Sequence, residues 1–211
     1  MKIAIIGMGN VGGTLGRRWV EAKHEIVFGA RNATDPKAAG DAKAIQAGIA
    51  TVAEAAAGAE VVVLAVPWQA ALDAVASAGN LGGKVLLDCT NPLTPDLSAL
   101  AIGTTTSAGE QVARAAKGAK VVKIFNTTGA GNMANPRYGP AGQTMLYAGD
   151  DAAAKAIAAR LARDIGFDPI DVGPLSAARI LEPFALVWIT LAIKQKLGPD
   201  FAFQLVRRPT P

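Results

Sequence analysis

Three glycines near the start of the chain are spaced as in a site for a dinucleotide. Gly7, Gly9 and Gly12 make the pattern G-x-G-x-x-G, which follows a strand-like run and opens a helical one. The first glycine of such a pattern permits a tight turn, the second lets backbone amides approach a pyrophosphate, and the third lets the helix pack closely on the strand. A strand–turn–helix unit that binds nothing is the structural alternative. We predict that the pyrophosphate is bound by Gly7, Met8, Gly9, Asn10 and Val11.

The end of the second strand-like run indicates which dinucleotide is bound. An NAD site usually offers an Asp or Glu about 20 residues after the glycines, to accept hydrogen bonds from the ribose. Here the run ends in Gly29-Ala30-Arg31-Asn32, without an acid. A guanidinium pairs with a 2′-phosphate, which a carboxylate would repel. A solvated arginine is the alternative reading, but we favour NADP(H), held by Ala30, Arg31, Asn32 and, on the following turn, Lys37.

Polar residues follow three further strand-like runs, where ligands of open parallel sheets bind. Backbone at 65–67 is expected to line the ribose and the nicotinamide. Asparagine and threonine side chains after the later strands can donate to and accept from a polar ring. We predict that the cofactor contacts Ala65, Val66, Pro67, Thr90 and Asn91, and that a second substrate contacts Asn126, Thr127, Thr128 and Ala130.

Proton donors for a carbonyl substrate are scarce in this chain. Neither tyrosine is followed by a lysine four positions later, and His24 precedes the second strand, at the end opposite the chemistry. Lys123 lies within a strand and is expected to be structural; a position in the site is the alternative. We therefore assign no catalytic side chain. Hydride exchange between two redox cofactors requires mainly the proximity and orientation of two rings. The scarcity of proton donors is consistent with such a reaction.

Bulk composition excludes several other classes of function. One cysteine, Cys89, and one histidine leave no metal site and no disulfide, and we expect a cytoplasmic protein. The net charge is +4 and the basic residues are scattered apart from the tail "LVRRP", so we expect no nucleic-acid partner. The most apolar run, 183–193, is shorter than the ~18 residues of a membrane span, so we expect no span. The first strand-like run begins at Lys2, so we also expect no signal peptide.

Strand-like and helical runs alternate along the chain and must position these residues. The central strands are continuous apolar runs, as in strands covered on both faces. We predict an α/β, Rossmann-type, doubly wound and mainly parallel sheet with a small helical C-terminal part: an NADP-binding domain at 1–175, then a helix and tail at 176–211. The loop 126–143 has no periodicity and is expected to be functional. Predicted strands are 2–6, 25–29, 49–52, 60–66, 84–88, 120–125, 144–148 and 168–172; predicted helices lie near 10–22, 36–47, 53–58, 68–78, 107–117, 151–165 and 176–197.

Longer motifs resemble the NADP-dependent reductases of the deazaflavin coenzyme F420, whose relatives include the oxidoreductase domains of membrane ferric reductases. The resemblance rests on "IIGMGNVGGTLGRRW", "EIVFGAR", "VVVLAVPW", "KVVKIFNTTGAGNM" and "DVGPLSAARILEPFALVWI". It implies that Ala30-Arg31 takes the place of a Ser-Arg pair for the 2′-phosphate. It also implies a cleft beside the C-terminal part and a homodimer. The archaeal reductases have a histidine where this chain has Asn126, so the acceptor stays open between deazaflavin, flavin and ferric iron reduced through flavin.

Two rival functions remain. One is an NADP-dependent dehydrogenase of a small acid or imine, which usually needs a long helical domain after the dinucleotide-binding part. The roughly forty residues available cannot build one. The other is a non-catalytic NADPH-sensing module, because a fold does not fix a function.

Overall fold

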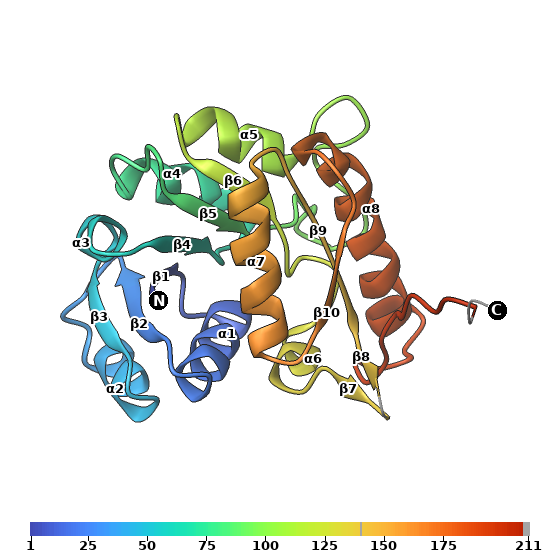
Figure 1. Cartoon of the computed structure of the whole chain (residues 1–211), viewed down its shortest axis with the longest axis horizontal. Helices are drawn as coiled ribbons and strands as arrows, with labels where there is room; N and C mark the ends of the chain where they lie inside the picture. Colours follow the sequence, from blue (N-terminus) through green and yellow to red (C-terminus); the bar gives the residue numbers. More distant parts are fainter. Residues whose placement is uncertain (140, 209–211) are drawn as a thin grey trace.

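Eight strands form one mainly parallel sheet at the centre of the molecule (Figure 1). The computed structural model describes residues 1–139 and 141–208. The order across the sheet is β10-β9-β6-β5-β4-β1-β2-β3, and only β6 and β9 pair antiparallel. The strands are β1 (Lys2–Ile6), β2 (Glu25–Ala30), β3 (Gly48–Thr51), β4 (Val61–Leu64), β5 (Val85–Asp88), β6 (Lys120–Lys123), β9 (Thr144–Gly149) and β10 (Asp168–Asp171).

Helices cover both faces of this sheet, which is why its strands are apolar on both sides. In β1, Ile3 and Ile5 pack into one core cluster, whereas Ala4 and Ile6 pack into the other. The first cluster includes side chains from α1, α2 and α7, and the second includes side chains from α3, α4 and α5. The helices are α1 (Asn10–Glu21), α2 (Pro36–Ala44), α3 (Val52–Ala57), α4 (Trp68–Ser77), α5 (Ala108–Ala115), α6 (Ala130–Ala134), α7 (Ala152–Asp164) and α8 (Ala178–Ile189).

The strand order reverses direction beside β1. From β1 the chain builds outward through β2 and β3, and it then returns to place β4, β5 and β6 on the other side. Ligands of such sheets bind in the crevice beyond the carboxyl ends of the strands at this reversal. The loops after β1 and β4 meet there, since Ala65 N donates to Ile6 O at 2.9 Å. The predicted α/β Rossmann-type fold is confirmed.

The segment 126–143 is more structured than the sequence predicts. It contains α6 and a small antiparallel pair, β7 (Arg137–Tyr138) with β8 (Ala141–Gly142); Pro140 lies outside the described residues. The expectation of a loop without regular structure is therefore wrong. These elements are only a few residues long, too short for a hydrophobic period to appear in the sequence.

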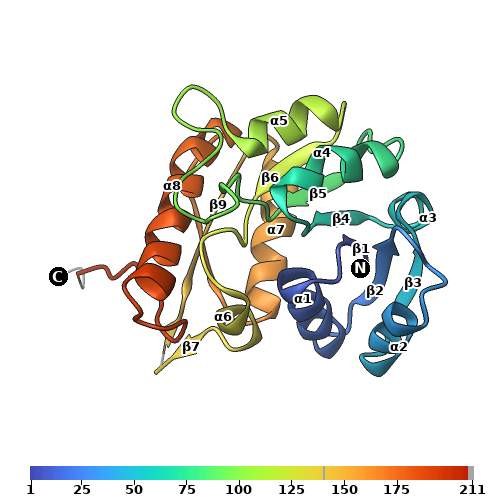
Figure 2. The same cartoon turned by 180° about the vertical axis from the view of Figure 1, so that it is seen from behind.

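The C-terminal helix is longer than its most apolar run. A short 3₁₀ turn (Leu175–Ala177) precedes α8 and a π-helical turn (Thr190–Lys194) follows it. Within the described chain this segment, Leu175–Lys194, has the length and apolar composition that crossing a membrane requires, so the estimate from 183–193 alone is too short. Figure 2 shows α8 at the edge of the molecule away from α2. Of the predicted part 176–211, residues 209–211 lie outside the described chain.

Candidate functional site

Two glycines of the loop are required by close packing, whereas the third faces open space. Gly7 has φ +107°, and a Cβ there would lie 2.4 Å from Ala65 O. A Cβ on Gly12 would lie 2.0 Å from Gly7 O. Both glycines are therefore required by the fold itself. A Cβ on Gly9, in contrast, would meet nothing within 4 Å, so the fold does not need a glycine there and the space in front of it is open.

The first turn of α1 offers free donors beside that space. Gly9 is the N-cap residue and has no side chain to cap the helix. The first N–H groups of a helix have no partner within the helix, and together with the helix dipole they attract anions. An open approach at Gly9 and uncapped amides after it fit a pyrophosphate.

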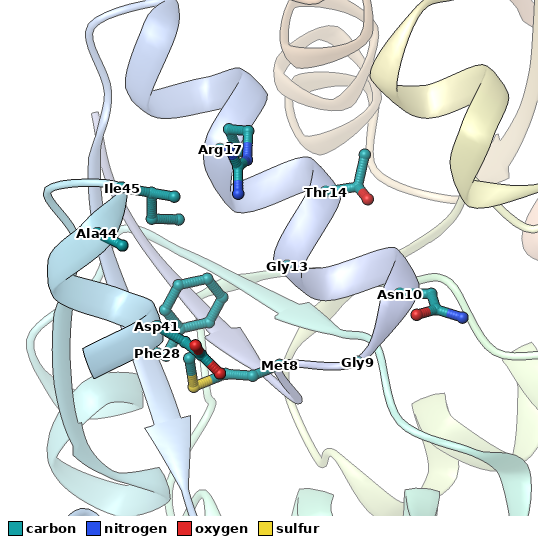
Figure 3. A pocket seen from close by; sticks show the side chains of 10 residues that line it. All are labelled: Met8, Gly9, Asn10, Gly13, Thr14, Arg17, Phe28, Asp41, Ala44 and Ile45. Carbon is teal, nitrogen blue, oxygen red and sulfur yellow. The ribbon is translucent and has the colours of Figure 1, made fainter. Parts of the chain in front are cut away.

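A hollow of about 330 Å³ lies between α1 and α2 next to this loop (Figure 3). Arg17 from α1 and Asp41 from α2 line it, and neither belongs to the motifs that predict the site from the sequence. Asp41 accepts a hydrogen bond from Lys37 Nζ at 2.9 Å, and this contact raises the pKa of the Lys37 ammonium above its usual value. The full lining is Met8, Gly9, Asn10, Gly13, Thr14, Arg17, Phe28, Asp41, Ala44 and Ile45.

The residues predicted for the 2′-phosphate lie together after β2. Ala30 ends the strand, and Arg31 is exposed and forms no ion pair within residues 1–139 and 141–208. Asn32 is partly engaged, because its Oδ1 accepts hydrogen bonds from the N–H and the hydroxyl of Thr34. Lys37 sits in the first turn of α2 and is paired with Asp41. Arg31 is thus the most available cation of the predicted set.

Thr90 is positioned beyond β5, but its polar groups are occupied. Its N–H and its hydroxyl donate to Asp88 Oδ1 at 2.9 and 2.8 Å, and its carbonyl accepts from Lys123. Thr90 is also buried. Its predicted contact with the cofactor stays a prediction, and in this arrangement a polar contact would be one in which the Thr90 hydroxyl oxygen accepts, because both of its donors are used.

Asn91 and Asn126 are joined by reciprocal hydrogen bonds across the ends of β5 and β6. Asn91 Nδ2 donates to Asn126 O at 2.8 Å, and Asn126 Nδ2 donates to Asn91 Oδ1 at 3.0 Å. Asn126 Nδ2 also donates to Leu181 O of α8 at 3.1 Å. Asn91, predicted to contact the cofactor, is therefore in direct contact with Asn126, predicted to contact the second substrate.

The rest of the predicted substrate side lies against α8. A Cβ on Gly129 would lie 2.5 Å from the Trp188 ring, so this backbone packs closely against the indole. Thr128 Oγ1 accepts a hydrogen bond from Asn132 Nδ2 at 2.9 Å, while Ala130 begins α6 and is partly exposed. Thr127 is buried, and its hydroxyl is 4.0 Å from the sulfur of Met145.

Three fully buried charges lie behind these loops. Lys123 Nζ is 3.0 Å from Asp88 Oδ2 and 2.9 Å from Glu182 Oε1 of α8. Glu182 also accepts from the N–H groups of Ala108 and Gly109, at the first turn of α5. Burial alone would lower the pKa of Lys123, but the two carboxylates outweigh it, and the pKa is raised. Lys123 is therefore a permanent cation.

Three candidate proton donors, Lys123, His24 and Tyr138, are engaged by other groups of the protein. The three protons of the Lys123 ammonium face three acceptors, Asp88, Glu182 and the Thr90 carbonyl, which leaves none for a ligand. His24 pairs with Asp164 at 2.9 Å, at the end of β2 away from the site. The Tyr138 hydroxyl lies 2.6 Å from Asn132 Oδ1, and burial raises the pKa of the Cys89 thiol, which keeps it protonated.

Comparisons with known proteins point to one family. Residues 2–92 match the family model described as NADP oxidoreductase coenzyme F420-dependent. The F420-dependent NADP reductase of Methanothermobacter marburgensis is 33% identical, over 93% of this chain and 95% of that protein. Metalloreductase STEAP3 of Rattus norvegicus is 31% identical over 88% of this chain, which spans only 36% of that longer protein.

Solved structures show the same fold. A protein of Arthrobacter sp. FB24, assigned as an F420-dependent NADP reductase, superposes with a TM-score of 0.88 at 36% identity, covering 98% of this chain and 100% of that one. An imine reductase of Streptomyces aurantiacus has a TM-score of 0.67 at 17% identity, over 92% of this chain and 64% of that one, which supports the fold alone. The chain is an oxidoreductase homologue that belongs to the F420-dependent NADP reductase family.

Proposed function

We propose that this protein transfers a hydride between NADPH and a deazaflavin or flavin. The observation that carries the proposal is the absence of an available proton donor among the described residues around the site, because the only buried ammonium, Lys123, has all three protons committed. A carbonyl substrate needs such a donor. A second redox ring needs only to be held against the nicotinamide.

The residues present fit a bound dinucleotide phosphate. The open space at Gly9 and the uncapped amides of Asn10 and Val11 would hold the pyrophosphate. Arg31 would pair with the 2′-phosphate, and backbone after β4 would line the nicotinamide. NADPH supplies the hydride when bound. The protein contributes orientation of the rings and exclusion of water.

Deazaflavin is the first candidate for the second ring. The relatives that this chain matches over nearly their full length are named F420-dependent NADP reductases. The match to a metalloreductase favours a flavin or, through it, ferric iron as the alternative acceptor. Asn126, Thr127, Thr128 and Ala130 are the residues we expect beside the acceptor.

The assay is direct. The protein is mixed with NADPH and offered coenzyme F420, FMN, FAD or a ferric chelate in turn, and loss of the reduced nicotinamide absorbance is followed. We expect rapid turnover with F420. Turnover only with flavin or flavin plus iron would select the alternative acceptor. Tight NADPH binding without turnover on any acceptor would contradict the proposal and indicate a sensor.

We further propose a cytoplasmic homodimer without a membrane span. The buried Glu182 joins α8 to the first turn of α5. This contact supports a role for α8, the most apolar helix, in packing within the protein. Its outer side still exposes Ile180 and Val187, and a second copy of the chain would cover them.

A further inference from the structure

Two unusual features occur side by side at the end of β6. Phe125 is a large buried residue with φ +61°, a left-handed conformation that such side chains rarely adopt. Asn126 follows it, is 3% exposed, and its Oδ1 has no hydrogen-bond partner in the described chain. Strained backbone and unsatisfied buried polar atoms both concentrate at functional sites. Their position is the strand end where the reacting rings are expected.

The orientation of the Asn126 amide is fixed by its neighbours. Oxygen and nitrogen of an amide are easily exchanged in a structure, so the assignment needs an independent argument. Asn126 Nδ2 lies 3.1 Å from the backbone carbonyl of Leu181, and a carbonyl can only accept. The group facing Leu181 must therefore be the NH₂.

The partner side chain is fixed by the same argument. Asn91 Nδ2 faces the backbone carbonyl of Asn126 at 2.8 Å, so Asn91 must present its oxygen to Asn126 Nδ2. Both amide protons of Asn126 are then donated, one to Leu181 and one to Asn91. The only hydrogen-bonding capacity left on this side chain is that of an acceptor.

We propose that Asn126 determines the class of the second substrate by hydrogen-bond polarity, its free Oδ1 accepting a hydrogen bond from an N–H on the edge of the second redox ring. This inference rests on the proposed function. The pyrimidine edge of flavins and deazaflavins carries such an imide N–H. A ketone or aldehyde presents only an oxygen acceptor, which this oxygen would repel, so the site selects for the ring and against a carbonyl compound.

Burial of the oxygen sharpens this selection. An acceptor that is shielded from water and left without a partner carries its full desolvation penalty. A ligand N–H that reaches it removes the penalty, whereas a ligand lacking the N–H leaves the acceptor unpaired. Sites of this kind discriminate strongly against the analogue that lacks the donor.

The test compares two compounds that differ only at this N–H, lumiflavin and 3-methyllumiflavin. With the wild-type protein and NADPH, we expect kcat/KM to be about tenfold higher for lumiflavin. Because a methyl group can also be rejected sterically, the pair is measured again with Asn126→Leu, which removes the acceptor at similar size. There the preference should fall to about twofold or less.

The outcomes separate the two proposals. Equal turnover of both compounds by the wild-type protein, or a preference that persists in Asn126→Leu, would overturn the role of Asn126 while leaving hydride transfer to flavins intact. Reduction of no flavin or deazaflavin at all would overturn the proposed function, and this inference with it. Should Asn126→Leu fail to fold, Asn126→Ala serves the same purpose, because water can then reach Leu181 O.

Discussion

Single residues divide the glycine loop into a part that builds the fold and a part that leaves room for a ligand. A Cβ added at Gly7 would lie 2.4 Å from the backbone oxygen of Ala65, and one added at Gly12 would lie 2.0 Å from the backbone oxygen of Gly7. Gly9 has an ordinary φ of −71° and an empty neighbourhood. The sequence pattern predicts three different roles for these glycines, and the distances from Gly7, Gly9 and Gly12 to their neighbours agree with that division.

The different surroundings of Gly9 and Gly12 predict different effects of an alanine substitution on stability and on NADPH binding. Gly9→Ala should change the free energy of unfolding by less than about 1 kcal/mol, since its methyl group meets no atom. It should nevertheless weaken NADPH binding by about tenfold or more, because the methyl group occupies the approach to the pyrophosphate. Gly12→Ala should instead destabilise the fold by several kcal/mol, on the order of a severe core clash. Denaturant melts and NADPH titrations measure both; an unstable Gly9→Ala would contradict the assignment.

We expect Arg31 to determine the choice between NADPH and NADH. It is exposed and unpaired in the described chain, so its guanidinium is free to form charged hydrogen bonds with a 2′-phosphate. Arg31→Ala should weaken NADPH binding by roughly 1.5–3 kcal/mol and leave NADH binding nearly unchanged.

A control for Arg31 lies on α7. Arg160 is 66% exposed and its one ion pair is long, at 3.8 Å, so Arg160→Ala should alter neither affinity. Isothermal titration with both dinucleotides gives the comparison. Equal losses for NADPH and NADH in Arg31→Ala would refute the 2′-phosphate contact.

At the scale of elements, α8 is locked to the first turn of α5 by charged groups. Glu182 accepts from two backbone N–H groups of α5, and Arg179 forms a two-point ion pair with Glu110. A carboxylate at a helix N-terminus is favoured by the helix dipole. These contacts hold the C-terminal helix against the loops that carry Asn91 and Asn126.

The ion pair between α5 and α8 predicts a pH dependence of stability. The hydrogen bond from Arg179 holds the pKa of Glu110 below its usual 4.5 in the folded state. A carboxyl with a lower pKa in the folded state stabilises the fold at neutral pH, and this contribution is lost as the pH falls below 4.5.

Comparison with a neutral variant isolates this contribution. Between pH 6 and about pH 3, the loss in free energy of unfolding should be smaller in Glu110→Gln than in the wild type. The difference should be about 1 kcal/mol or less, since Arg179 is 39% exposed and solvent screens the pair. Arg179→Met should reproduce it. Parallel pH profiles for all three proteins would show that the pair contributes nothing.

The sequence predicts local elements well and distant contacts poorly. The apolar runs and the glycine pattern depend on neighbouring residues, so the main strands, α1 and the position of Arg31 follow from them. The Lys123–Glu182 contact joins positions 59 residues apart, and Arg17 and Asp41 line one hollow only because α1 and α2 lie side by side. No local period encodes such pairs. Likewise, the hydrogen bond from Lys123 to the Thr90 carbonyl depends on β5 pairing with β6.

The whole molecule leaves one apolar side uncovered. Ile180 and Val187 are 62% and 48% exposed and stand two turns apart on α8, hence on one face. Ile193 and Leu197, which follow the helix, are also exposed, at 56% and 62%. Exposed apolar side chains that gather on one face indicate an interface, and we expect a second copy of the chain to cover Ile180 and Val187 in a symmetric dimer.

The mass of the particle in solution tests this expectation. Light scattering should give twice the 21.5 kDa chain mass for the wild type, and Val187→Asp should shift the protein toward the monomer, because burying an unpaired carboxylate in an apolar interface is costly. Leu72→Asp is the matched control: Leu72 is 38% exposed on α4, away from α8, so its substitution should leave the dimer intact. A monomeric wild type, or equal dissociation by both substitutions, would rule out this face as the dimer interface. The exposed apolar side chains of Leu175–Lys194 would then need another partner to cover them. Binding of the protein to lipid vesicles would be the next measurement.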